Sequence, residues 1–383
     1  MSTYDSNCAL IANYINPIIG EIEVQEFTTR AADKYVQTLQ KTRPVIRRNV
    51  QPRSQYLSPV IIEKVVKLAS CALKQAVRWE MIAKNPFEHI IIPRVEYKKR
   101  DIWTAEDIRT ALNACTDTKL YISMNLAFAC SLRIGEILGL TWNNVHISDE
   151  EIAKDDAWIY VDKELTRASK RAIEMLGEKD IIHIFKPLMS NTSTRIILKK
   201  PKTKSSERRV WLPKTVAYIL KEWKKAQDDI KELLGDEYED YDFVVTLANG
   251  RPCENRIIEN AFIKLREEAE LPNVVFHSLR HSSTTYKLKL NHGDLKATQG
   301  DTGHSQITMI TNVYAHILDE DRKINAQKFE SAFYANPDMR DVKPPKESSE
   351  ATVDIAAIIE QLKSNPELVQ ALAGLIAENR TAN

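Results

Sequence analysis

The stretch CSLRIGEILGLTW, residues 130–142, constrains the fold because it places an arginine and a glutamate inside an apolar run. Arg133 has apolar residues on both sides, and an arginine without a partner is almost never fully buried. Glu136 follows one helical turn later and is a suitable ion-pair partner. Two interpretations remain open. Arg133 and Glu136 form an internal ion pair, or Glu136 holds Arg133 rigid and directed at an anionic ligand in a cleft.

Apolar spacing elsewhere in the chain is mostly helical. Two helices are expected within residues 8–40, and Thr28 or Thr29 is expected to cap the second. A third helix is expected over most of residues 58–85. Two more helices are expected within residues 119–147, on either side of a break near residues 131–133. Thr104 and Asp107 have the spacing of a capping box at a further helix start.

The region 157–213 has the composition of β-structure. The segments AWIYVDKEL, TRIILKK and RRVWLP read as strands, and the last two are expected to form a hairpin with a charged tip. From Thr215 onward the chain reads as mainly helical. The fold class expected is therefore mainly α with a small antiparallel β-sheet. It comprises an all-helical domain over residues 1–97, an α+β domain over 98–340, and a linker with an amphipathic tail over 341–383.

The net charge of +1 conceals a basic N-terminal region. Residues 1–100 contain 16 Lys and Arg against 9 Asp and Glu, which favours a polyanion-binding surface. Residues 41–54 carry five basic residues and no acid, so we interpret them as a phosphate-contacting loop in preference to a solvated one. The basic residues in these segments that we expect to contact phosphate are Arg43, Arg47, Arg48, Arg53, Lys99 and Arg100.

Other sequence features restrict the class of protein. Five scattered cysteines and the lack of a secretory signal favour a reduced, cytoplasmic protein. No apolar run is long enough for a membrane span. The sequence contains no P-loop, no GxGxxG after a strand and no HExxH, so we expect no nucleotide cofactor and no metal.

Three further stretches contain residues able to act on a phosphate. Lys202 lies in the charged segment KKPKTKSSERR, where a solvated lysine and one delivered into a DNA groove are both possible. His277 and Arg280 are spaced to share a helix face, and arginine binds phosphate oxygens through its planar fork. His281 completes an HxxxH spacing with His277, but no third metal ligand is nearby. In TGHSQITMITNVYAH, Tyr314 follows His304 by ten residues and is a packing aromatic or a nucleophile.

Taken in order, SLRIGEILGLTW, PKTKSSERRVWLP, HSLRH and TGHS…VYAH resemble the motifs of the tyrosine recombinases, or phage-type integrases. The resemblance covers residues of roughly 8–340 and is closest to the integrases of conjugative transposons. It implies Tyr314 as nucleophile, Arg133 and Arg280 as phosphate clamp, and Lys202 as general acid. It also implies His277 as proton shuttle or base, with His304 donating a hydrogen bond to the scissile phosphate.

The resemblance further implies that Glu136 supports the catalytic arginines and does not itself react. The partners implied are double-stranded DNA core sites, a homo-tetramer on paired sites and an accessory excision factor. This chain departs from the family pattern in having Ser131 where a glycine is common. Relatives also carry an additional arm-binding domain before helices that here begin almost at Met1. Either this protein uses core sites alone, or the chain starts late relative to a longer relative.

The function expected is site-specific recombination of DNA through a covalent 3′-phosphotyrosine, integrating and excising a mobile element. A type IB topoisomerase-like enzyme shares this chemistry and is one alternative. A DNA-binding regulator of the same fold without turnover is the other. The amphipathic segment 352–378 is either a solvated tail or a protein-docking element.

Overall fold

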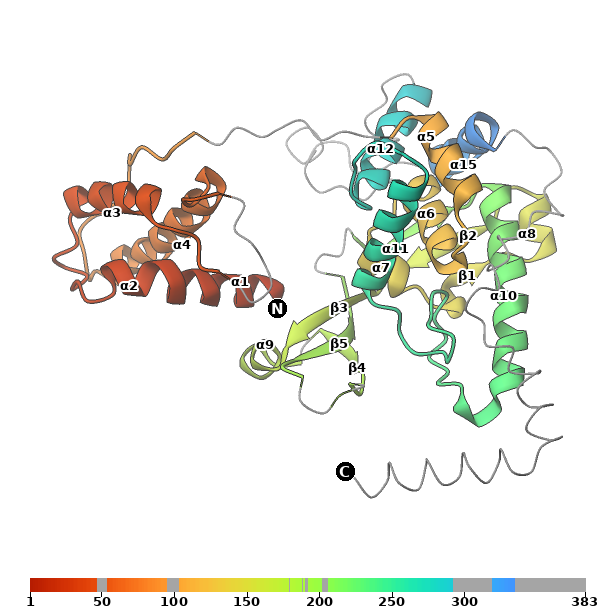
Figure 1. Cartoon of the computed structure of the whole chain (residues 1–383), viewed down its shortest axis with the longest axis horizontal. Coiled ribbons are helices and arrows are strands. Elements are labelled where there is room, and N and C mark those ends of the chain that lie inside the picture. Colours follow the sequence, from red (N-terminus) through yellow and green to blue (C-terminus); the bar gives the residue numbers. More distant parts are fainter. Residues whose placement is uncertain are drawn as a thin grey trace.

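The chain is mainly helical and contains two small antiparallel sheets, which confirms the fold class expected from sequence (Figure 1). This computed structural model describes residues 1–46, 54–94, 103–178, 180–187, 189, 192–201, 206–291 and 319–334. Among the helices of these segments, none has both the length and the apolar composition that a membrane span requires.

The N-terminal helices enclose a hydrophobic core of their own. A π-helical turn, Ile11–Ile15, joins α1 to α2, and the Thr28 side chain accepts a hydrogen bond from Ala31 N (3.2 Å) at the start of α3. The first helix begins at Ser2, earlier than expected, and α4 ends at Arg78, before the expected stop. The helices are α1 (Ser2–Leu10), α2 (Asn16–Ile19), α3 (Thr29–Lys41) and α4 (Pro59–Arg78).

Apolar spacing explains why α3 packs where it does. The helix buries Ala32, Tyr35, Val36 and Leu39, one face at helical spacing, against Val65 and Val66 of α4 and their neighbours. This core is separate from the larger one formed by residues 103–329. A contact does join the two parts of the chain, because Ser169 Oγ donates a hydrogen bond to Asp5 Oδ1 (2.6 Å).

The larger core is built around α6, whose residues from Leu120 to Ala129 are nearly all buried. The capping box expected at Thr104 and Asp107 is confirmed at the start of α5. The helices here are α5 (Ala105–Ala114), α6 (Thr118–Ala129), α7 (Ile134–Leu138), α8 (Asp149–Ala153), α9 (Lys170–Leu176), α10 (Lys214–Leu234), α11 (Asn255–Glu268), α12 (Ser278–Leu290) and α15 (Asp319–Phe333).

The β-region divides into two three-stranded sheets, with strand orders β1-β2-β6 and β3-β5-β4. The expected hairpin of β5 with β6 is wrong, because β5 pairs with β3 and β4 whereas β6 pairs with β2. The segment AWIYVDKEL is likewise two strands in different sheets. The strands are β1 (Val145–His146), β2 (Trp158–Val161), β3 (Glu164–Ser169), β4 (Ile181–Ile184), β5 (Thr194–Lys199) and β6 (Arg208–Trp211).

The last described helix, α15, is docked firmly onto the larger core. Phe329 is fully buried, with its ring centroid 4.8 Å from that of Phe128 and 4.5 Å from that of Phe333. Glu330 accepts hydrogen bonds from Thr215 N (3.2 Å) and Thr215 Oγ1 (2.5 Å) at the start of α10. Helix α15 is thereby attached beside α6, α10 and α12.

We expect Phe329→Ala to lower the free energy of unfolding by about 3–5 kcal/mol, because it removes a fully buried ring from an aromatic cluster. The measurement is urea unfolding followed by circular dichroism. Ser331→Ala, at an exposed position on the same helix, should change stability by less than about 0.5 kcal/mol. Equal stability of the Phe329 variant and wild type would contradict the docking of α15.

Candidate active site

Glu136 lies at the start of α7, where the chain turns sharply after α6. Arg133 occupies the N-cap position in extended conformation, with φ −77° and ψ 150°. The Arg133 backbone N–H donates to Glu136 Oε2 (3.0 Å), as expected for a glutamate three residues after a helix cap. This local capping turn directs the carboxylate back toward the residues that precede the helix.

Three guanidinium groups surround that carboxylate, and we call Arg133, Arg208 and Arg280 the arginine cluster. Arg133 Nη1 lies 2.7 Å from Oε1 of Glu136. Arg208 makes a two-pronged contact, with Nη1 3.3 Å from Oε1 and Nη2 3.1 Å from Oε2. Arg280 Nη1, from α12, lies 3.8 Å from Oε2. Residues from α7, β6 and α12 therefore meet at a single carboxylate.

The predicted ion pair of Arg133 with Glu136 is present, and the direction of Arg133 at an anionic ligand stays a prediction. Its side chain is 34 % exposed, whereas those of Arg208 and Arg280 are 2 % and 1 % exposed. Arg133 thus pairs with Glu136 and also reaches the surface. Arg133 and Arg280, which the resemblance implies as a phosphate clamp, both contact Glu136.

The cluster carries excess positive charge. Burial by itself would raise the pKa of Glu136, but the charge of Arg208 and its hydrogen bonds, with Arg133 N and Arg280, lower that pKa to about 2. The carboxylate is therefore ionised at neutral pH. Three guanidinium groups to one carboxylate leave these four residues with a net charge of +2, which suits an approaching phosphate anion.

Ser131 helps to hold Arg280. Its carbonyl oxygen accepts a hydrogen bond from Arg280 Nη1, and its Oγ lies 2.6 Å from Ser283 Oγ. Ser131 has φ 55°, a left-handed conformation that costs little only for glycine. This conformation explains why a glycine is common here in the resembled family. In this chain the serine at this position forms a buried hydrogen bond with the Ser283 hydroxyl.

Arg280 is nearly inaccessible in this structure. Direct contact between its guanidinium and a DNA phosphate therefore requires the residues that cover it to move. His277 is exposed and lies in the turn before α12, so it precedes the helix rather than sharing a helical face with Arg280. Its ring centroid is 4.9 Å from that of His281. No group of three or more His, Cys, Asp or Glu suited to a metal occurs among the described residues.

Several predicted residues lie outside the described segments: Lys202, His304 and Tyr314, together with Arg47, Arg48, Arg53, Lys99 and Arg100. The described elements that flank His304 and Tyr314 are α12 and α15. These two helices contact each other, and Lys328 Nζ lies 3.5 Å from the carbonyl oxygen of Leu290. Arg43, the remaining phosphate-contact candidate, is exposed just after α3.

The chain matches the model of the phage integrase family over residues 102–321, more than half of its length. It belongs to the phage integrase family. The resemblance to tyrosine recombinases seen in the sequence is thereby confirmed. The matched region begins before α5, includes the arginine cluster and ends within α15.

Relatives of this phage integrase family member include a recombinase and an integrase. A tyrosine recombinase XerC-like protein of Caldanaerobacter subterraneus subsp. tengcongensis is 28% identical over 256 residues, which cover 64% of this chain and 59% of the relative. The ICEBs1 integrase of Bacillus subtilis is 20% identical over 332 residues, covering 85% and 77%. The match to the XerC-like protein thus spans less than two thirds of that relative.

A solved structure shares the fold. The Tn1549 transposon integrase in complex with transposon right end DNA aligns with a TM-score of 0.60 at 18% identity, over 85% of this chain and 92% of that one. At this identity the likeness shows the fold alone.

Arg208 is the cluster member that sequence reasoning missed. It begins β6 in the segment RRVW, whose side chains alternate between faces. Arg208 and Val210 share the buried face, whereas Arg209 is exposed, with its guanidinium carbon 4.2 Å from the ring centroid of Trp158. Because Arg208 lies two residues before the apolar Val210, strand alternation predicts that its side chain points to the same buried face.

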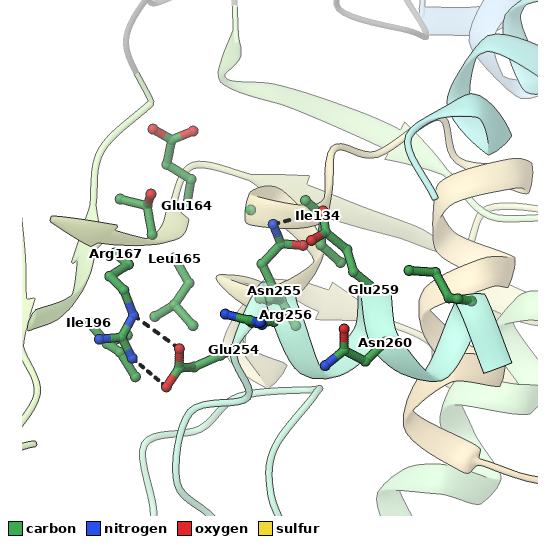
Figure 2. A pocket seen from close by; sticks show the side chains of 14 residues that line it. Ile134, Glu164, Leu165, Arg167, Ile196, Glu254, Asn255, Arg256, Glu259 and Asn260 are labelled. Carbon is green, nitrogen blue, oxygen red and sulfur yellow. Dashed lines mark hydrogen bonds and ion pairs between the residues drawn. The ribbon is translucent and has the colours of Figure 1, made fainter. Parts of the chain in front are cut away.

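A separate cavity of about 970 Å³ lies between α7, β3 and α11 (Figure 2). Leu138, Leu165 and Ile263 contribute apolar surface to it, and Arg167 Nη2 lies 2.6 Å from Glu254 Oε1 among its lining residues. Of the predicted catalytic residues that the structure describes, Arg133, His277 and Arg280 do not line this cavity. It is therefore distinct from the arginine cluster.

We expect Glu136→Gln to lower the free energy of unfolding by about 3–5 kcal/mol at pH 7, because the buried guanidinium groups lose their counter-charge. Since its pKa falls from 4.5 unfolded to about 2 folded, ionised Glu136 stabilises the fold fully above pH 4.5. That contribution is lost as the pH falls toward 2. Guanidinium chloride unfolding at pH 7 and pH 3 should show the difference between wild type and variant shrinking at the lower pH.

The matched control is Glu232→Gln, at an exposed position of α10, which should unfold like wild type. A Glu136→Gln variant as stable as this control would show that the arginine cluster does not need the carboxylate for folding stability.

Proposed function

We propose that this chain is a site-specific DNA recombinase that cuts and rejoins strands through a 3′-phosphotyrosine intermediate, integrating and excising a mobile element. The observation that supports this most is the convergence of Arg133 and Arg280, from separate elements, on Glu136. A positively charged site held by a rigid carboxylate suits the charge that develops on a phosphate during strand transfer.

In the proposed reaction the Tyr314 oxygen attacks the scissile phosphorus. The new bond joins that oxygen to phosphorus, and the bond from phosphorus to the 5′ oxygen breaks. Arg133 and Arg280 neutralise the non-bridging oxygens, and His304 donates a further hydrogen bond to the phosphate. Lys202 protonates the departing 5′ oxygen, while His277 takes up the tyrosine proton. A 5′-hydroxyl of another strand reverses these steps and rejoins the DNA.

The proposed partners follow from the family and from the charge distribution. Residues 1–97 would bind core DNA, residues 98–340 would carry out catalysis, and residues 341–383 would follow as linker and tail. The basic N-terminal region and exposed Arg43 support contact with duplex DNA. A homo-tetramer on paired core sites, an accessory excision factor and a cytoplasmic location complete the proposal.

The decisive variant is Tyr314→Phe. A nicked suicide duplex from the end of the encoding element should trap wild type as a covalent adduct that resists boiling in detergent. The variant should form none, because it lacks the attacking oxygen. Adduct formation by both proteins would overturn the role of Tyr314, and no adduct from either would favour a DNA-binding regulator without turnover.

A second readout separates the recombinase from a topoisomerase. Strand exchange between two duplexes should require matched sites, whereas relaxation of any supercoiled plasmid without paired sites would favour the type IB topoisomerase-like enzyme.

Arg43→Ala should weaken binding to all duplex sequences by a similar factor and reduce the salt slope of binding by about 1, because one phosphate contact is lost. Fluorescence anisotropy from low to moderate salt measures this slope. The matched control is Arg30→Ala. Arg30 is an exposed residue of α3 that lies outside the basic segment 41–54. An unchanged slope for Arg43→Ala would remove Arg43 from the DNA contacts.

A further inference from the structure

We propose that Arg208 is a positioning residue that couples the loop carrying Lys202 to the arginine cluster through the Glu136 carboxylate. The inference rests on the proposed function and gives a role to a residue of the motif PKTKSSERRVWLP to which the resemblance assigned none. Arg208 lies 72 residues after Glu136 and contacts both carboxylate oxygens.

Arg208 contributes most to the low pKa of Glu136, but charge balance alone does not require three guanidinium groups. Arg133 and Arg280 already supply two positive charges to one carboxylate, at 2.7 Å and 3.8 Å. Burying a third guanidinium costs free energy for its lost hydration and for repulsion between like charges. In addition, Arg208 Nε is buried and has no hydrogen-bond partner in the described part of the chain. A residue retained at such cost is expected to have a use beyond charge balance.

The contacts of Arg208 identify that use. Its Nη1 donates to the carbonyl oxygen of Ser206 (3.1 Å) as well as to Glu136 Oε1 (3.3 Å). Ser206 closes the connection between β5 and β6, and Lys202 lies four residues before it. One guanidinium nitrogen thus joins the end of the lysine-bearing loop to the carboxylate that holds Arg133.

The sheet topology explains why the loop needs this anchor. Its two ends belong to different sheets, since β5 pairs with β3 and β4 while β6 pairs with β2. Within the strands that the structure describes, no ladder of hydrogen bonds joins β5 to β6. On the β5 side, Lys199 Nζ lies 2.5 Å from Glu164 Oε1. On the β6 side, Arg208 ties the loop to the active site.

Arginine is suited to this position and lysine is not. The planar fork contacts two carboxylate oxygens and a backbone carbonyl at the same time, whereas an ammonium group has no such fixed geometry. Arg208→Lys therefore keeps the charge and removes the coupling, and Arg208→Met removes both.

The test compares two substrates that differ at the leaving group. One nicked suicide duplex has the ordinary 5′ oxygen at the scissile phosphate, and the other has a 5′ sulfur. In the second, the bond from phosphorus to sulfur breaks and a thiolate departs. Because a thiol has a pKa of ~8.5, that leaving group needs no proton from Lys202. A defect in placing the general acid is rescued by sulfur, and a defect in the arginine clamp is not.

We expect Arg208→Met and Arg208→Lys to cleave the oxygen substrate about 10²–10³-fold more slowly than wild type, the loss typical of a misplaced general acid. Both should approach the wild-type rate on the sulfur substrate. Arg209→Met, the adjacent exposed arginine, should match wild type on both. Arg133→Met should remain slow on both, because its lost charge is at the non-bridging oxygens.

Several outcomes would overturn the proposal: wild-type rates for either Arg208 variant on the oxygen substrate, or equal losses on both substrates. Hydrogen exchange of the 200–207 backbone provides a readout independent of catalysis, measured on Arg208→Lys by mass spectrometry. Exchange faster than in wild type supports the coupling, and unchanged exchange contradicts it. Wild type that forms no adduct on either substrate refutes the proposed function, and the exchange result still decides the role of Arg208.

Discussion

The carboxylate of Glu136 is the interaction on which the rest of the site depends. It receives Arg133 from its own helix start, Arg208 from β6 and Arg280 from α12. Each of these elements belongs to a different part of the larger core. Their relative positions are therefore set at one buried anion. The attraction is strong because the surroundings exclude water, and for the same reason an unpaired charge there would be costly.

The surrounding fold keeps that anion in place. The buried helix α6 contacts α7 and α12. After α6, the strained turn at Ser131 reverses the chain direction before α7 begins. Phe329 of α15 packs against Phe128 of α6, so α15 belongs to the same core. The described helices before and after the segment with His304 and Tyr314 are α12, which contains Arg280, and α15, and these two helices contact each other.

The two sheets contribute in different ways. The sheet β1-β2-β6 carries Arg208 into the interior, and β3-β5-β4 supports the other end of the lysine-bearing connection. Because no strand ladder among the described residues links β5 to β6, a side-chain contact is needed to join the β6 end of that connection to the cluster. Arg208 supplies such a contact. Through it, Arg208 would help to position Lys202 for the reaction proposed above.

Sequence by itself determined the local features. The caps at Thr28 and Thr104, the buried face of α3 and the pairing of Arg133 with Glu136 depend on residues within one or two helical turns of each other. The ordered motifs also identified the family, because the chemistry requires those residue types. Tertiary structure alone decided that β5 and β6 lie in different sheets and that Arg208 joins Glu136. Such pairings join residues far apart in the chain, and their free energy comes from burial and charge compensation that no local pattern encodes.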